Sequence, residues 1–360
     1  MTIRPNDAAT LAKGVQELFA EAETLMLERV AAALAAGTDA PDWMEQKLLN
    51  LQFLTRQLDR ILADLQKGIP GAVERAIGIA YNRGVATAGG ELSAAGMVYG
   101  AFNPVTATDA VAAVVSETME RVSPVIFRAC RAAVDTYQRA ITQATVQTAV
   151  GTMNRREASR LALTRLAKHG ITGFRDASGR NWAMASYAEM AVRTSTAQAM
   201  LQGHTDRVQE LGVDTVVVSD APEECRICRP FEGKVLSISG ADVGKRLSDG
   251  RRIVDSLAGA RRKGLYHPGC RHSHSIYLPG ITKPAKDTAD PEGDALRQKQ
   301  RAYERRVREL KREAAIAEQF DPQAGKLARA KLRAKQQEFT AWREANDRKN
   351  LSYRTSLTAR

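Results

Sequence analysis

Apolar residues recur at alternating steps of three and four along most of the first 150 residues, and this spacing constrains the fold more than any other feature. Such a stripe lies on one face of an α-helix with 3.6 residues per turn. Between Asp7 and Gly37 the stripe is carried by Leu11, Val15, Leu18, Ala22 and Leu25. This part of the chain is therefore predicted to form long amphipathic helices.

Glycine and proline are expected to divide this helical region. A second helix should start at Pro41 and close at Gly68 and Pro70, because proline removes a backbone donor and clashes with the preceding turn. Shorter helical pieces are expected at 73–86 and 92–99.

A longer helical run follows at 107–149, and Pro124 is predicted to kink or divide it. Hydrophobic residues make up 44% of the chain and aromatic residues only 5%, a balance that suits helices better than sheets. No apolar stretch is long enough for a membrane span, and none near the start is typical of a signal peptide. We therefore expect no membrane contact.

The middle of the chain has a different residue pattern. A glycine-punctuated turn or hairpin is expected at 170–182, followed by a helix at 186–211. Runs rich in β-branched residues predict strands at 213–220, 233–239 and 273–279. This segment is therefore predicted to be α+β.

The carboxy-terminal segment is the basic part of the chain. Residues 291–360 contain eighteen Lys and Arg against ten Asp and Glu, and so carry eight of the twelve net positive charges. Asp321 and Pro322 resemble a helix start, which predicts either a helical hairpin or two independent helices. Double-stranded DNA is the expected partner of this tail, without sequence preference. The alternative is a solvated pair of helices.

The predicted fold is thus mainly α with a small central α+β domain, long amino-terminal helices and a charged helical carboxy-terminal tail. The length suggests two or three units. We place them at 1–150, 151–282 and 283–360, where the composition changes.

Cysteine and histidine cluster in the middle region, as two pairs separated by about forty residues. A CxxC pair at Cys225 and Cys228 precedes an HxxC pair at His267 and Cys270. These are ligand types of a structural zinc site, and four of them would leave no position for a reactive water. Zinc is the expected cofactor, with His272 as a possible substitute ligand. The alternative is a set of small buried thiols.

Two further clusters of polar residues could form sites, but their sequence context favours structural roles. Arg193 lies in a predicted helix with several hydroxyl residues, but no glycine-rich phosphate loop accompanies it. Four acidic residues surround the CxxC pair, where flanking turns make solvated loop carboxylates the expected state. They are Asp220, Glu223, Glu224 and Glu232.

Several ordered motifs over about 185–280 resemble the phage minor capsid (minor head) protein family, which is related to the MuF-like head-morphogenesis domain. They are YAEMAVRT, the glycine-interrupted helix that continues it, CRIC, EGKV and HPGCRH. QKQRAYERR in the tail and, less specifically, AIGIAYNRGVATAGGEL at 76–92 also fit. One departure is His272, where MuF-like relatives often have cysteine.

The resemblance implies a low-copy virion protein, made in the bacterial host cytoplasm and located at the capsid wall, its interior or the portal vertex. Its implied partners are the portal and major capsid proteins, and its implied role is in head assembly, DNA packaging or ejection. No catalytic or organic-cofactor-binding residues accompany it, so an enzyme is not expected.

Two rival functions remain open at this stage. A metal-dependent DNA-processing enzyme of HNH type would use Cys, His and positive charge, but a second CxxC and an Asp-His pair are missing. An ADP-ribosyltransferase-like toxin would use Arg193 and the run Ser237–Ser239, but no downstream Gln/Glu-x-Glu motif follows.

Overall fold

The structure is a computed structural model. It describes residues 3, 7–37, 42–97, 100, 109–151, 157, 161, 172–175, 179, 181–221, 226–284, 290–320 and 322–357. These form two compact units that interleave along the sequence. Unit 1 comprises 1–13, 70–119 and 189–298, and unit 2 comprises 14–69, 120–188 and 299–360.

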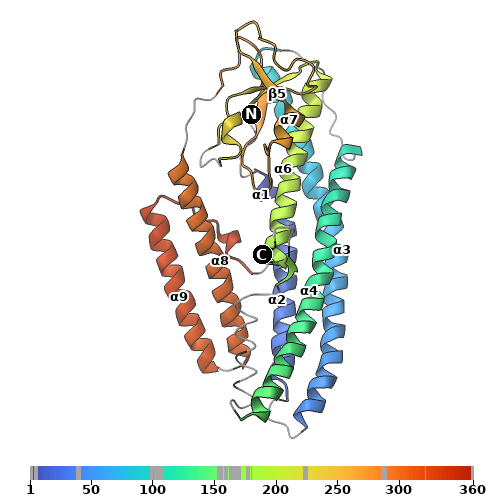
Figure 1. The fold of residues 1–360 in the computed structure, drawn as a ribbon, viewed down its shortest axis with the longest axis vertical. Coiled ribbons are helices and arrows are strands. Elements are labelled where there is room, and N and C mark those ends of the chain that lie inside the picture. Colours follow the sequence, from blue (N-terminus) through green and yellow to red (C-terminus); the bar gives the residue numbers. More distant parts are fainter. Residues whose placement is uncertain are drawn as a thin grey trace. The chain divides into compact units, whose positions relative to one another are not determined.

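The expected mainly helical fold is confirmed (Figure 1). The described helices are α1 Asp7–Leu11, α2 Lys13–Ala35, α3 Trp43–Ala94, α4 Asp109–Ala149, α6 Met184–Glu210, α7 Leu257–Arg262, α8 Pro291–Phe320 and α9 Pro322–Ala345. The strands are β1 Thr172–Arg175, β2 Asn181–Ala183, β3 Thr215–Val218, β4 Val235–Ser237, β5 Ile253–Ser256 and β6 His274–Ile276. Short 3-10 turns lie at Arg229–Phe231 and Ser352–Arg354. The three-region division at 1–150, 151–282 and 283–360 stays a prediction.

The helix end expected at Gly68 and Pro70 is wrong, and so is the division that was one of the two outcomes expected at Pro124. Helix α3 continues through Gly68 and Pro70, so the pieces expected at 73–86 and 92–99 belong to one helix that ends at Ala94. Helix α4 likewise continues through Pro124. In α3 the residues on either side of Pro70, Ile69 and Val73, are both fully buried. The packing of these two side chains offsets the backbone hydrogen bond that Pro70 cannot form. Local helix propensity alone does not reveal this compensation.

The core of unit 2 is a set of packed helix faces. Its largest fully buried apolar side chains come from α2, α3 and α4, and include Phe19, Met26, Leu34, Leu54, Leu58, Ile126 and Tyr137. The predicted seam residues of the first helix, Val15 and Ala22, are buried as well. The other three, Leu11, Leu18 and Leu25, are half-buried, so the three-four spacing identified the buried face only in part.

Lys47 is the exception among these core residues, because it is a fully buried cation. Its Nζ donates to the carbonyl oxygens of Ala33 at 3.1 Å and Leu34 at 2.6 Å, and also to that of Ala36. These carbonyls lie in the last turn of α2 and just beyond it. The ammonium group therefore caps α2, whose terminus carries partial negative charge.

The basic tail forms the helical hairpin that was one of its two expected arrangements (Figure 1). Tyr303 of α8 stacks on Phe339 of α9 with ring centroids 5.3 Å apart, and Trp342 lies beside both. Val307 and Leu310 continue the seam and are buried. The opposite face of α9 is charged and exposed, whereas many charged side chains of α8 are half-buried.

Unit 1 contains a four-stranded sheet in the order β5-β4-β3-β6. Strand β3 pairs antiparallel with β4 and β6, and β4 pairs parallel with β5. The strands expected at 213–220, 233–239 and 273–279 are confirmed as β3, β4 and β6. Strand β5 was not expected, because four of the six residues of RRIVDS are charged or polar and mask its short apolar core.

Helices α3 and α6 meet within unit 1 at two glycines. A Cβ atom at Gly84 would lie 2.8 Å from the backbone nitrogen of His204, and one at Gly203 would lie 2.9 Å from the carbonyl carbon of Tyr81. Real Cβ atoms do not approach backbone so closely, so only glycine permits this crossing. The glycine that interrupts the α6 pattern thus has a packing role.

The hairpin expected at 170–182 is confirmed in part, because β1 pairs antiparallel with β2. The sequence also predicts a basic helix near 155–168, which lies almost wholly outside the described residues. Among the described helices, none has an apolar stretch long enough to span a bilayer.

Candidate metal centre

Two loops of unit 1 bring a thiol pair and an imidazole together. Cys228 precedes the 3-10 turn at Arg229–Phe231, Cys270 ends the turn after His267, and His272 stands two residues before β6. The Sγ atoms of Cys228 and Cys270 are 3.4 Å apart, and Cys270 Sγ lies 3.4 Å from His272 Nδ1. Within the described residues these three side chains form the group whose ligand atoms all lie within 4.8 Å of one another.

The spacing of the two sulfur atoms suits one tetrahedral ion. Zinc–sulfur bonds of about 2.3 Å at tetrahedral angles place two sulfurs about 3.7 Å apart, close to the observed separation. The two cysteines form no disulfide. Cys228 is fully buried, in the cluster that contains Leu236 and Leu265. A metal held here would be enclosed by the core of unit 1.

Glu232 holds His272 in the orientation that a metal ligand requires. Its carboxylate forms a short hydrogen bond with His272 Nε2, and both side chains are nearly fully buried. With Nε2 donating to the carboxylate, Nδ1 keeps its lone pair and faces the cysteines. Carboxylate partners of this kind orient ligating histidines in many metal sites. The expectation that Glu232 is a solvated loop carboxylate is therefore wrong.

The side chains of this cluster act on one another electrostatically. The Cys270 thiol and burial hold the pKa of Cys228 above its ordinary value, against the opposite effect of His267 and His272. Burial acts to lower the pKa of His272, but hydrogen bonds to Cys228 and Glu232 outweigh it and raise that pKa. The raised pKa keeps Cys228 a thiol, and a metal would displace its proton on binding.

His267 lies at the margin of this group. Its Nδ1 is 2.9 Å from the carbonyl oxygen of Pro268, and its effect on the Cys228 pKa shows that it also reaches that thiol. Cys225 lies outside the described residues. His267 and Cys225 therefore both remain candidates for the fourth position.

The turn that presents Cys270 depends on backbone conformations that few residues adopt. Gly264 has φ +103°, and a Cβ atom there would lie 2.7 Å from Ile227. Tyr266 has φ 63°, in the left-handed region that is unfavourable for a bulky residue. Its hydroxyl group is anchored on His274, which offsets this strain.

Behind the cysteines lies a buried polar network that the sequence patterns did not predict. The Nδ1 atom of His274 accepts from the Tyr266 hydroxyl at 2.9 Å, and its Nε2 is 3.1 Å from Thr205 Oγ1. Since Thr205 already donates its proton to Leu201, Nε2 of His274 is the donor in that pair. Burial holds the pKa of His274 well below its ordinary value, and the charges of His204 and Arg261 add to this effect.

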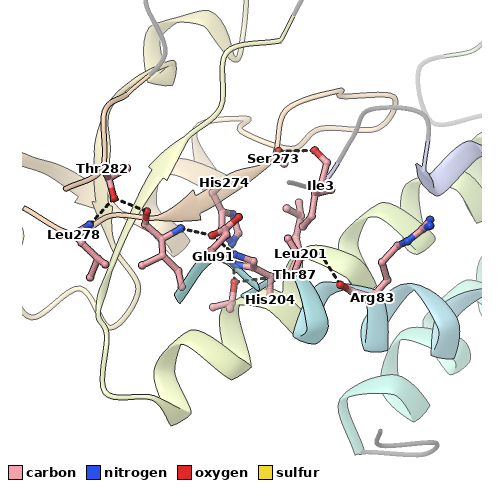
Figure 2. A network of polar contacts seen from close by, with 12 residues as sticks. Ile3, Arg83, Thr87, Glu91, Leu201, His204, Ser273, His274, Leu278 and Thr282 are labelled. Carbon is pink, nitrogen blue, oxygen red and sulfur yellow. Dashed lines mark hydrogen bonds and ion pairs between the residues drawn. The ribbon is translucent and has the colours of Figure 1, made fainter. Parts of the chain in front are cut away.

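Glu91 joins this network to helix α3. Its Oε2 accepts from His204 Nε2 at 3.1 Å and from the Ile276 backbone nitrogen at 2.8 Å. Figure 2 shows Glu91, His204 and His274 converging from α3, α6 and β6. The signal in the sequence was the segment 76–92, which ends on Glu91 and Leu92 and looked the least specific of the motifs.

The two other clusters weighed in the sequence have structural roles where they are described. The hydroxyl groups of Thr194 and Thr196 donate to carbonyls one turn earlier in α6. Ser237 is fully buried and donates to Asp214, which also accepts from the Ser239 backbone. These hydrogen bonds explain the polar side chains as structural, so no bound substrate is needed to explain them. Glu223 and Glu224 lie outside the described residues.

Comparison with known proteins identifies a family along nearly the whole chain. The family model described as phage minor capsid protein 2 matches residues 3–343. No curated protein and no solved structure matches the chain significantly. The match includes both units, the metal-ligand candidates and most of the basic tail.

Proposed function

The chain belongs to the phage minor capsid protein 2 family, and from this premise we propose that it acts in head morphogenesis near the portal, where its tail contacts packaged DNA. Membership of this family makes it a structural component of the phage virion. The family match is the observation that carries the proposal. Portal and major capsid proteins are its proposed partners, at the capsid interior or the portal vertex.

Exposed apolar side chains support contact with other head proteins. Leu48, Leu49 and Phe53 lie within two turns near the start of α3 and are 59%, 61% and 57% exposed. Contiguous exposed apolar residues on a helix are typical of protein interfaces. This face of unit 2 is therefore the proposed contact with a portal or capsid protein.

The exposed face of α9 supports contact with DNA. Lys326, Arg329 and Arg333 are spaced by three and four residues, so they follow one side of the helix. Arg329 forms an ion pair with Glu318, while Lys326 and Arg333 are exposed. Phosphate contacts from such a row would be independent of sequence and sensitive to salt.

Purified particles test the virion role. Quantitative mass spectrometry should find the chain at low copy number, and an asymmetric reconstruction should place it at or near the portal vertex. Absence from the virion, or high copy number across the shell, would overturn the proposal.

DNA contact has its own test. Random-sequence duplex binding by the full-length chain should be steeply salt-dependent, and Lys326→Gln with Arg333→Gln should reduce the slope. The matched control is Arg56→Gln with Arg60→Gln, which removes two exposed cations from α3. Equal effects of the two pairs would count against a tail-specific contact.

We propose secondly that Cys228, Cys270 and His272 hold one structural zinc ion, with Cys225 or His267 as the fourth ligand. The convergence of three ligand atoms and the Glu232 contact support this proposal. Zinc would fasten the two loops to the sheet and activate no water in a closed site. Elemental analysis of the full-length protein should find one zinc per chain. Absence of metal, with thiols that titrate freely in the folded protein, would reject it.

The rival functions are outcomes of two assays on the same protein. Metal-dependent nicking of duplex DNA would favour a DNA-processing enzyme of HNH type. Hydrolysis of NAD would favour an ADP-ribosyltransferase-like toxin. We expect neither activity.

A further inference from the structure

A short hairpin in unit 1 carries an exposed concentration of positive charge. It runs from Gly244 to Ile253 and leads into β5, labelled in Figure 1. Backbone hydrogen bonds join Gly244 to Ile253 and Leu247 to Arg251, with Gly250 at φ +82° in the turn. Its four exposed cations are Lys245, Arg246, Arg251 and Arg252.

Arg246 and Arg252 face each other across this hairpin. They form an isolated antiparallel bridge, so their side chains leave the same face of the two-stranded ribbon. Like charges in directly opposite positions are destabilising. No carboxylate pairs with either arginine in the described part of the chain, and both are exposed. The hairpin thus maintains an unfavourable pair of cations.

The nearby acidic residues are already engaged elsewhere. Asp249 accepts from the Tyr277 hydroxyl group and from the Arg251 backbone nitrogen. Asp242 pairs with Lys245. Asp255 pairs with Lys263 at 2.8 Å. One guanidinium nitrogen of Arg246 donates to the Gly250 carbonyl oxygen at 3.0 Å, but no carboxylate in the described residues neutralises Arg246 or Arg252, so both charges are available to an external anion.

Helix α7 extends the same basic segment. Arg261, Arg262 and Lys263 end this helix and are exposed, so residues 245–263 carry seven cations against two carboxylates. The segment lies in unit 1, whereas α9 belongs to unit 2. It is therefore a separate concentration of charge from the tail, although the tail holds most of the net charge of the chain.

We propose that the 244–253 hairpin is a second contact for the phosphate backbone of double-stranded DNA, with Arg246 and Arg252 binding phosphate. A guanidinium group presents a planar fork of donors that matches phosphate oxygens. A phosphate bound between the two arginines would attract both guanidinium groups and offset the repulsion between them. The identity of the polyanion rests on the proposed DNA contact of the tail, but the site and its residues do not.

The number of phosphate contacts can be read from the salt dependence of binding. Each contact contributes about 0.9 to the slope of log affinity against log salt. Full-length Arg246→Gln with Arg252→Gln should therefore lower the slope on random duplex DNA by about 1.8. The control pair Arg56→Gln with Arg60→Gln removes equal charge and should leave the slope unchanged. Arg246→Lys with Arg252→Lys keeps both charges and should retain most of it.

Thermal unfolding provides the accompanying control for the folded state. Removing two opposed cations should leave the melting temperature unchanged or raise it. If the glutamine pair unfolds instead, the single variant Arg252→Gln should still lower the slope by about 0.9.

Three results would overturn the inference. In the first, the slope is unchanged in the hairpin variant but reduced in the Lys326→Gln and Arg333→Gln variant. The tail would then be the DNA contact, and the hairpin cations would serve to protect an edge strand. An unchanged slope with reduced incorporation into particles would assign the hairpin to an acidic protein face. No DNA binding by the wild-type chain would remove both DNA contacts.

Discussion

Gly203 of α6 packs directly against the backbone of Tyr81 in α3, where a Cβ atom would lie 2.9 Å from the Tyr81 carbonyl carbon. The same crossing brings Gly84 against Met200 and His204. Because the obstructing atoms belong to the backbone, they cannot move aside as a flexible side chain would. The crossing positions His204 toward Glu91 and thereby links α3 to the sheet.

Gly203→Ala is expected to destabilise unit 1. Overpacking of this kind typically costs about 1–3 kcal/mol, and the chain should melt at lower temperature. Gly14→Ala in α2 is the matched control, because nothing lies within 4 Å of a Cβ atom there. Alanine at that position should be neutral or slightly stabilising. Equal melting temperatures for both variants would refute the close crossing.

Glu91→Leu should destabilise the same unit by a different route. The substitution leaves the His204 imidazole and the Ile276 backbone nitrogen without their shared acceptor. Each buried donor left unsatisfied costs about 1–3 kcal/mol. Glu91→Gln retains an acceptor oxygen and should lose less. Denaturant unfolding of the two variants measures the difference, and an equally stable leucine variant would contradict the network.

Lys47→Met should weaken unit 2, because three carbonyl oxygens at the end of α2 lose their donor. The expected loss is about 1–3 kcal/mol in the free energy of unfolding. Lys67→Met, at an exposed position in the same helix α3, is the control. No difference between the two variants would show that the cap contributes nothing to stability.

The stability contributed by Lys47 should also depend on pH. Burial lowers its pKa to about 8 from 10.5. Between these values the unfolded chain binds more protons than the folded chain, so this group makes stability rise with pH across that window. The difference between wild type and Lys47→Met should therefore widen from about pH 8 upward and stay constant below it. A difference that narrows over that range would contradict the assigned protonation state.

Cys228→Ser should release zinc and lower the melting temperature, because structural zinc contributes on the order of 10 kcal/mol to small domains. Cys130→Ala is the control, since Cys130 is a buried free thiol in unit 2. It should keep the metal. Glu232→Gln should keep the three ligands but bind zinc about 10–100-fold more weakly, through loss of the carboxylate that orients His272. Competition with a chromogenic chelator measures both effects.

How far the sequence could predict the fold differed between local and distant features. The three-four stripes identified the helices and part of their buried faces, and β-branched runs identified β3, β4 and β6, because these periodicities follow from backbone geometry alone. Pro70 does not end its helix and Pro124 does not divide its helix, contrary to the local rule. The cost of Pro70 is local, while the packing of Ile69 and Val73 that offsets it comes from segments distant in the sequence.

The candidate site shows the same division. Residue types and spacing marked Cys225, Cys228, His267 and Cys270 as possible ligands, with His272 as a substitute, since a two-residue spacer is a local property of a turn. Glu232 was misjudged, because its environment depends on His272, forty residues away.

The sequence by itself determined the helical character, the basic tail, the ligand types and the family. Only the tertiary structure decided which imidazole faces the thiols, that Glu91 joins His204, and that Arg246 stands opposite Arg252. The physical reason is that burial and charge compensation are properties of side chains brought together by packing. No spacing along a single chain specifies which distant partner fills a buried hydrogen bond.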